Sequence, residues 1–328
     1  MTRDAWSRRA TELLIADRAT DPATPLRQCT LPSGAPLYVK DESVRPTGSV
    51  KHGFARSLFL DGVSRGVIRA DTPLVDATSG NMAVAEAYFA RLLGLPFTAV
   101  VPGKTSAVKR ARIEEQGGAC CPVDPPLAVY ERAERLAADM DGHYLDCLTA
   151  IGPAVDACPP SLADEILADI KPDWVVTGVG TGATSRSLGR QLSTHIAVAD
   201  PENSAYFPGW TTDCAEYATG MPSRIEGIGR PRMEPAFDPD VVDLVIPVPD
   251  ATSVAAMRWL SGVGFAFGPS TGAAFWGALH LVHRGGPVVV IAADAAAPYE
   301  TSYYDDSWVA AKGWDLTAAL ADLGNRLR

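Results

Sequence analysis

The chain has 328 residues, of which 47% are hydrophobic and 21% are charged, a composition typical of soluble globular proteins. A formal net charge of −10 and a pI near 5.0 argue against nucleic acid or an anionic membrane surface as the main partner, and favour a small-molecule ligand. The N-terminal residues carry charges where a secretory signal needs an apolar stretch, and Asp294 interrupts the strongest apolar run, so we expect a cytoplasmic protein without membrane spans.

Short apolar segments alternate with helical patterns along the whole chain. This alternation predicts an α/β fold with largely parallel, buried strands. Strands are predicted at 36–41, 72–78, 97–102, 119–124, 173–180, 195–200, 243–248 and 287–295, and helices from about residue 51 and at 82–95, 253–262 and 316–327.

A soft domain boundary is predicted near residue 148. The stretch "TAIGPAVDACPP" interrupts the regular pattern with prolines and a glycine. We therefore expect an N-terminal domain at 1–147 and a C-terminal domain at 148–328, with the chain free to cross between them.

The stretch "VRPTGSVKHGFARSL" places Lys51 where a turn leads into a helix. Gly48 marks the turn, Thr47 and Ser49 are candidate N-cap residues, and the apolar residues that follow recur at helical spacing. The positive end of a helix disfavours a protonated amine, which makes this an unusual place for an ordinary surface lysine. Taken alone, the motif still allows a surface lysine at a helix start.

The loop "DATSGNMAVAEAY" follows a predicted strand and precedes a helix. Hydroxyl groups of Thr78 and Ser79, the free backbone at Gly80 and the amide of Asn81 can hold a carboxylate at a helix N-terminus. An ordinary capped helix start is the alternative.

A glycine-rich turn, "VVTGVGTGATSRSLGR", suits a phosphate dianion. A nicotinamide-binding reading competes with this one, because Gly178, Gly180 and Ala183 match G-x-G-x-x-A and Asp200 ends the next strand. Under the nicotinamide-binding hypothesis, the loops that contain Lys51 and Asn81 have no assigned function. Another small-residue helix entry, "FAFGPSTGAAFWGALHL", offers the Ser270 hydroxyl.

The six cysteines and five histidines show no spacing typical of a metal site. No CxxC pair occurs, and the cysteines are expected to be free thiols in a reducing compartment. We expect no metal.

Four motifs, "PTGSVKH", "TSGN", "GVGTGAT" and "GPSTGA", occur in this order and resemble those of the fold type II pyridoxal-phosphate enzymes, the cysteine synthase family. Stretches such as "ADPENSAYFPGW" and "SRIEGIGRPRMEPAF" are similar to the branch of bacterial L-cysteine desulfhydrases. The resemblance implies two open twisted, mainly parallel sheets flanked by helices, with the cofactor in the cleft between domains, and a homodimer.

The resemblance also implies roles for individual residues. Lys51 would carry pyridoxal 5'-phosphate as an internal aldimine and later remove the substrate α-proton. Asn81 would bind the cofactor's phenolic oxygen, and Ser270 the pyridine nitrogen. The phosphate would lie in a cradle formed by Gly180, Thr181, Gly182, Ala183 and Thr184, and the substrate would contact Thr78, Ser79, Gly80, Asn81, Met82 and Cys147.

The implied reaction is β-elimination on cysteine or a β-substituted alanine, through an α-aminoacrylate, which releases sulfide or another leaving group, pyruvate and ammonia. A β-replacement synthase is the alternative, a dehydrogenase using residues 178–183 is a distant one, and a non-catalytic binding module with the same fold is a third class. Met82, Cys147 and Gly53 depart from the family's usual residues near the substrate, which allows an unusual amino-acid substrate.

Overall fold

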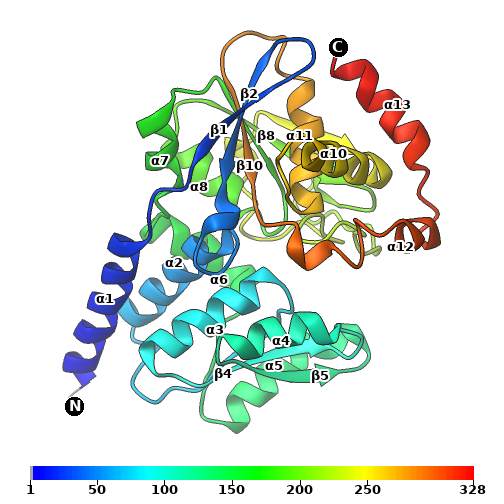
Figure 1. Cartoon of the computed structure of the whole chain (residues 1–328). Helices are drawn as coiled ribbons and strands as arrows, with labels where there is room; N and C mark the ends of the chain where they lie inside the picture. Colours follow the sequence, from blue (N-terminus) through cyan, green and yellow to red (C-terminus); the bar gives the residue numbers. More distant parts are fainter. Residues whose placement is uncertain (1–2) are drawn as a thin grey trace. The chain divides into compact units, whose positions relative to one another are not determined.

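The computed structural model of the protein describes residues 3–328, which form two compact units, each with its own sheet (Figure 1). The N-terminal unit comprises residues 3–22, Arg45–Thr47 and Lys51–Pro160. The C-terminal unit comprises Ala23–Val44, Gly48–Val50 and Ser161–Arg328. The chain therefore crosses repeatedly between the units before Lys51.

The observed division differs from the one expected at 147/148. The segment read as an interruption is mostly helix α6 (Cys147–Ala157), which includes Pro153 and belongs to the N-terminal unit. A proline inside a helix costs roughly 3 kcal/mol, but Ile151, Ala154 and Val155 bury apolar surface on the same helix and offset that cost. Tertiary burial therefore overrides the local sequence signal here.

The sheet of the N-terminal unit has four parallel strands in the order β5-β4-β3-β6. Its central strand β3 is buried throughout, as expected for a parallel strand with helices on both faces. Its elements are α1 (Arg3–Thr20), α2 (Lys51–Ser64), β3 (Leu74–Asp76), α3 (Asn81–Leu93), β4 (Phe97–Pro102), α4 (Ala107–Glu115), β5 (Ala119–Val123), α5 (Val129–Asp139), β6 (His143–Tyr144) and α6.

The sheet of the C-terminal unit has six strands in the order β1-β2-β10-β7-β8-β9, and all neighbouring strands are parallel except β1 and β2. Its elements are β1 (Leu26–Thr30), β2 (Pro36–Asp41), α7 (Leu162–Asp169), β7 (Trp174–Gly178), α8 (Ala183–Gln191), β8 (His195–Pro201), α9 (Tyr206–Thr211), β9 (Leu244–Val248), α10 (Asp250–Gly262), α11 (Pro269–Leu279), β10 (Val288–Ala292), α12 (Asp306–Ala311) and α13 (Leu316–Arg326). Short 3-10 helices at Glu42–Val44, Pro126–Ala128, Pro239–Val241 and Ala297–Tyr299 complete the two units.

These two mainly parallel sheets confirm the predicted fold class, and every predicted strand overlaps an observed one. Strands β1 and β6 were not predicted. In β1 only Cys29 is buried, and β6 has two residues, so neither carries a clear apolar pattern.

Helix α11 is the centre of the core in the C-terminal unit, because each of its residues is buried against the sheet strands or α10 (Figure 1). The closing helix α13 packs against α10. Leu323 and Leu327 are buried, whereas Leu320 is 46% exposed, so the apolar face of this helix is narrow.

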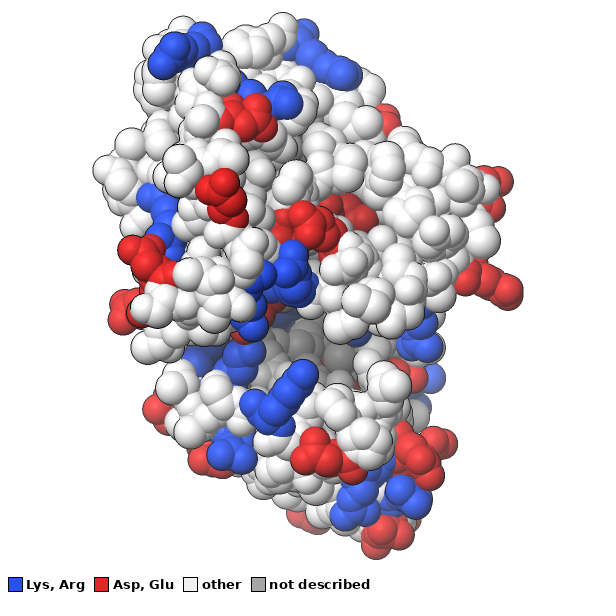
Figure 2. All heavy atoms as spheres, turned by 90° about the vertical axis from the view of Figure 1, so that its right-hand side faces the viewer, with Lys and Arg blue, Asp and Glu red and all other residues white. Residues whose placement is uncertain are grey.

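No helix among residues 3–328 is long and apolar enough to cross a membrane. Acidic and basic side chains are interspersed on the face shown in Figure 2.

Candidate active site

Lys51 is the first residue of α2, as the sequence predicts. The residue is half-buried, and its Nζ lies 5.5 Å from the ring centroid of Phe54. Thr47 does not cap the helix, since its hydroxyl is buried and makes no hydrogen bond within the described chain. The helix-start position of Lys51 is therefore set by the backbone before it.

That backbone is attached to the C-terminal unit just beyond strand β10. The Val50 N–H donates to the Ala293 carbonyl at 2.8 Å, and Ser49 forms an antiparallel bridge with Asp294. The Gly268 N–H also donates to the Asp294 carbonyl at 3.1 Å, and Gly268 precedes α11. The segments that lead into Lys51 and into Ser270 thus share one anchor after β10.

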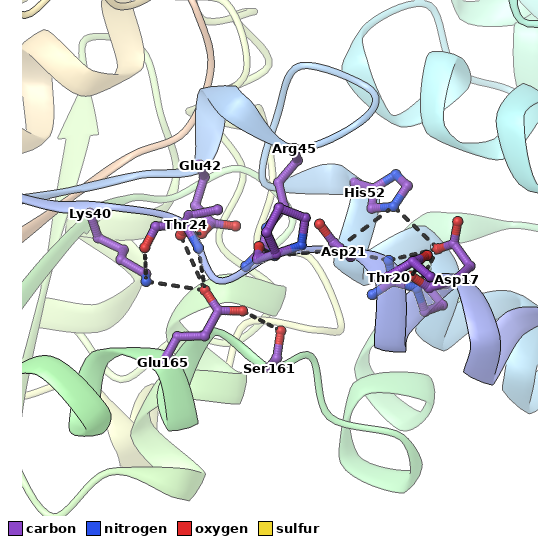
Figure 3. Close-up of polar contacts among 12 residues, drawn as sticks. Asp17, Thr20, Asp21, Thr24, Lys40, Glu42, Arg45, His52, Ser161 and Glu165 are labelled. Atoms are coloured by element: carbon purple, nitrogen blue, oxygen red, sulfur yellow. Dashed lines mark hydrogen bonds and ion pairs between the residues drawn. The ribbon is translucent and has the colours of Figure 1, made fainter.

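Buried charges in the N-terminal unit join α1 to α2 (Figure 3). The Arg56 guanidinium contacts Asp17 at 2.7 Å and Asp21 at 2.9 Å, and Arg45 contacts Asp21 at 3.2 Å. His52 Nε2 lies 3.4 Å from an Asp17 carboxylate oxygen. Burial alone would raise the pKa of Asp17, but hydrogen bonds from His52, Tyr88 and Arg56 lower that pKa to about 2. This network holds the first turns of α2.

A second buried network lies within the C-terminal unit (Figure 3). The ammonium of Lys40, at the end of β2, donates to the Thr24 carbonyl at 2.6 Å and pairs with Glu165 at 3.1 Å. Ser161 donates to the same Glu165 carboxylate at 2.6 Å. Because Ser161 precedes α7, these contacts fix β2 to the start of that helix.

The Thr78–Asn81 loop connects β3 to α3, and α3 begins at Asn81, one residue before the predicted start at residue 82. Gly80 is the N-cap and has no side chain to satisfy the helix N–H groups. Thr78, Ser79 and Asn81 are only partly buried, so their polar groups and the N-terminus of α3 can bind an anion. Met82, also half-buried, follows in the same turn.

At the end of β3, where this loop begins, Asp76 forms a buried cluster with Glu86 and Cys147 that was not predicted from the sequence. Their carboxylate oxygens and sulfur lie within 4.8 Å of one another. Asp76 accepts hydrogen bonds from the backbone N–H groups of Ala77 at 2.8 Å and Cys147 at 3.4 Å. Cys147 is 4% exposed. A glutamate inside the apolar stretch "MAVAEAYFA" was the available signal.

The glycine-rich turn after β7 ends at Gly182, the N-cap of α8. Gly182 has a left-handed φ of +91°, and a Cβ at this position would lie 2.4 Å from the Phe237 Cα. A Cβ at Gly180 would lie 2.3 Å from the Gly227 carbonyl oxygen. The Thr181 hydroxyl accepts from Ala183 N–H at 3.3 Å, and Gly182 has no side chain to cap the N–H groups that follow. The turn therefore fits a phosphate group at a helix N-terminus.

Ser270 lies in the first turn of α11 and is 5% exposed. A Cβ on Gly178 would lie 3.5 Å from the Ser270 carbonyl oxygen, so the serine adjoins the start of the glycine-rich turn. Within the C-terminal unit the structure brings together Gly180 to Thr184 and Ser270. Within the N-terminal unit, the N–H of Cys147 reaches the end of β3, from which the Thr78–Asn81 loop departs.

Asp200 does not serve as the ribose-binding acid that a dinucleotide site needs. Its carboxylate is 1% exposed and accepts the Phe207 N–H at 2.8 Å. Burial raises the pKa of Asp200 to about 6, which opposes a role as an exposed anion. The dehydrogenase alternative thus loses its acidic residue.

The family described as pyridoxal-phosphate dependent enzyme matches residues 20–294 of this chain. The chain belongs to this family. It is therefore an enzyme that depends on pyridoxal phosphate. The glycine-rich turn from Gly180 to Thr184 fits the phosphate group of this cofactor.

Similar proteins were found by sequence and by structure. L-cysteine desulfhydrase Cds1 of Mycobacterium tuberculosis is 44% identical, over 97% of this chain and 94% of the relative. Cysteine synthase A of Escherichia coli is 27% identical, over 79% of this chain and 84% of the relative. The crystal structure of O-ureido-L-serine synthase superposes with a TM-score of 0.77 at 25% identity, over 90% of this chain and 98% of that one. These matches confirm the fold type II resemblance.

Proposed function

We propose that this enzyme catalyses β-elimination on L-cysteine, with sulfide, pyruvate and ammonia as products. The observation that carries the proposal is the 44% identity, over nearly the full length of both chains, to a protein named L-cysteine desulfhydrase. In this reaction the Cβ–S bond breaks, sulfur leaves with the electron pair, and water finally replaces the amino nitrogen.

The bound pyridoxal phosphate supplies an electron-withdrawing ring that allows an amino acid to lose its α-proton. We assign the covalent attachment of this cofactor, and then the removal of the α-proton, to the Nζ of Lys51. The helix-start position of Lys51 supports this assignment, because the dipole of α2 favours the neutral amine.

We assign cofactor binding to residues from three segments of the chain. Backbone N–H groups and hydroxyls from Gly180 to Thr184 would hold the phosphate, and Asn81 the phenolic oxygen. Ser270 would hydrogen bond to the ring nitrogen. A neutral hydroxyl at that position does not keep the ring protonated as a carboxylate would, which favours prompt loss of a β-substituent.

We assign the substrate carboxylate to Thr78, Ser79, Gly80 and Asn81, with Met82 beside it. The N-terminus of α3 supports this role, since its N-cap residue Gly80 has no side chain that could cap the helix. A homodimer and a cytoplasmic location complete the proposal, on the basis of the family resemblance. Light scattering during size-exclusion chromatography measures the mass of the particle and so tests the homodimer.

The product list tests the reaction. Purified holoenzyme with L-cysteine should release sulfide, pyruvate and ammonia in equal amounts. With O-acetylserine and sulfide, accumulation of cysteine without pyruvate would instead establish β-replacement, the reaction class suggested by the names of the synthase relatives. Cofactor binding without turnover of either substrate would indicate a non-catalytic binding protein.

A further inference from the structure

Two carboxyl groups of the N-terminal unit lie side by side in an apolar interior. Asp76 ends β3 and is 1% exposed, and Glu86 lies in the second turn of α3 and is 0% exposed. No Lys, Arg or His among residues 3–328 pairs with either group. Two adjacent buried carboxylates without a cation are strongly unfavourable, so the pair must hold a proton.

The contacts distinguish the two groups. Both oxygens of Asp76 accept backbone N–H groups, from Ala77 at 2.8 Å and from Cys147 at 3.4 Å, and these contacts stabilise a negative charge. Neither oxygen of Glu86 meets a donor in the described chain. Glu86 can therefore satisfy its hydrogen bonding only as an acid that donates to Asp76.

The surrounding charges act in the same direction. Burial, then the charge of Asp76 and the hydrogen bond to it, raise the pKa of Glu86 well above its usual value. Burial also raises the pKa of Asp76, but its hydrogen bonds with Glu86 and Cys147 oppose that rise. Burial raises the pKa of Tyr144 on β6, and the electrostatic effects of Asp76, Asp146 and Cys147 raise it further. The Tyr144 hydroxyl therefore stays neutral.

We infer that Glu86 is a neutral acid that shares its proton with an ionised Asp76, and that this pair positions the loop Thr78–Asn81 and the start of α6. Asp76 fixes both segments through the N–H groups of Ala77 and Cys147, and Glu86 allows Asp76 to remain ionised in the interior. The positioning role rests on the proposed function, which assigns Thr78–Asn81 to the substrate. Both acids act as positioning residues.

The test compares Glu86→Gln with Asp76→Asn, two neutral substitutions of nearly unchanged size. In Glu86→Gln the new side-chain amide can still donate to Asp76, so affinity for cysteine, read from the cofactor's absorbance change on titration, should stay within about twofold. In Asp76→Asn one N–H loses its acceptor, so the KM for cysteine should rise about tenfold or more with a smaller change in kcat. Equal losses in both variants, or a larger loss in Glu86→Gln, would refute the inference.

Infrared difference spectra detect the shared proton without any assay of turnover. The carbonyl band of a protonated carboxylic acid should be present in the wild-type holoenzyme at neutral pH and absent from Glu86→Gln. If Asp76→Asn fails to fold, this measurement still shows whether the pair holds a proton. Absence of the band, or a stoichiometric metal ion that Glu86→Gln loses, would overturn the inference, whereas lack of cysteine turnover with the band present would refute only the proposed function.

Discussion

The Val50 N–H donates to the Ala293 carbonyl at 2.8 Å, which fixes the residue before Lys51 to the chain just beyond β10. Consecutive Cα atoms are separated by about 3.8 Å, so Lys51 cannot move far from this anchor. The Ala293 N–H in turn donates to the Thr271 hydroxyl at 3.2 Å, beside Ser270. The backbone of Ala293 therefore holds the residues next to Lys51 and next to Ser270. We assign these two side chains to opposite ends of the cofactor ring.

Lys51→Ala tests the covalent attachment. Loss of a positioned base lowers rates about 10²- to 10⁴-fold, and turnover of cysteine should fall by at least that much. Borohydride reduction of the wild-type holoenzyme should label the peptide that contains Lys51, as mass spectrometry can show. Lys171→Ala, at an exposed lysine, is the matched control and should retain turnover and labelling. A label on another lysine would refute the assignment.

Gly182→Ala tests the phosphate cradle. The new Cβ would lie 2.4 Å from the Phe237 Cα, so the turn must shift and cofactor affinity should fall. Gly220→Ala controls for the left-handed conformation, because Gly220 also has a positive φ but no atom within 4 Å of a Cβ. Equilibrium dialysis of cofactor separates the two variants. Equal affinity in both would exclude a role for this turn in phosphate binding.

Thr271→Val should lower stability without changing the cofactor spectrum, whereas Ser270→Ala should change the spectrum with little loss of stability. Valine removes the acceptor of the Ala293 N–H inside the core, which should cost about 1–3 kcal/mol of unfolding free energy and leave the cofactor spectrum unchanged. Ser270→Ala should change the cofactor spectrum and slow turnover with little loss of stability. Urea unfolding and absorbance spectra measure both. A Ser270→Ala spectrum identical to that of the wild type would place Ser270 away from the ring nitrogen.

Asp17 should make stability depend on pH at the acid end. Its pKa is about 2 in the folded protein, against 3.8 as the ordinary value, so its contribution is full above pH 3.8 and disappears as the pH falls toward 2. That contribution is about 2 kcal/mol at neutral pH. Asp17→Asn should lose it, and the difference from wild type should shrink as pH falls.

Urea unfolding at several pH values measures this difference. Asp139→Asn is the control, since the Asp139 side chain is 72% exposed in its pair with Arg132 and such pairs contribute little. A deficit in Asp17→Asn that stays constant with pH would indicate a packing effect rather than a lost charge.

Local signals in the sequence predicted the helix start at Lys51, the Asn81 helix and the glycine turn, because each depends on neighbouring residues. The Asp17–Arg56 pair and the Asp76–Glu86–Cys147 cluster were missed, since their members come from different elements and meet only in the folded chain. Helix α6 was missed because buried apolar side chains outweigh the effect of Pro153. Gly53 departs from the family's usual residue at a position where a Cβ would lie 3.2 Å from the Pro160 Cβ. This contact is also long-range in sequence, so it was not visible in the local pattern.

Met82 and Cys147 were expected to shape specificity together, but the structure gives them different environments. Met82 is half-buried, directly after Asn81, whereas the Cys147 sulfur lies within 4.8 Å of the buried carboxyl groups of Asp76 and Glu86. Met82→Thr should restore one hydrogen bond to a substrate, which corresponds to roughly a two- to tenfold gain in kcat/KM for cysteine over larger S-substituted analogues.

Cys147→Gln should instead lower stability by about 1–3 kcal/mol, because the longer side chain must fit into a packed interior. Its relative kcat/KM values should stay close to those of the wild type, and Cys147→Ser is the control of similar volume. Competition assays with paired substrates and urea unfolding give both quantities. A shift toward cysteine in Cys147→Gln without loss of stability would mean that the side chain at 147 reaches the substrate after all, and that residue 147 and Met82 select the β-substituent jointly.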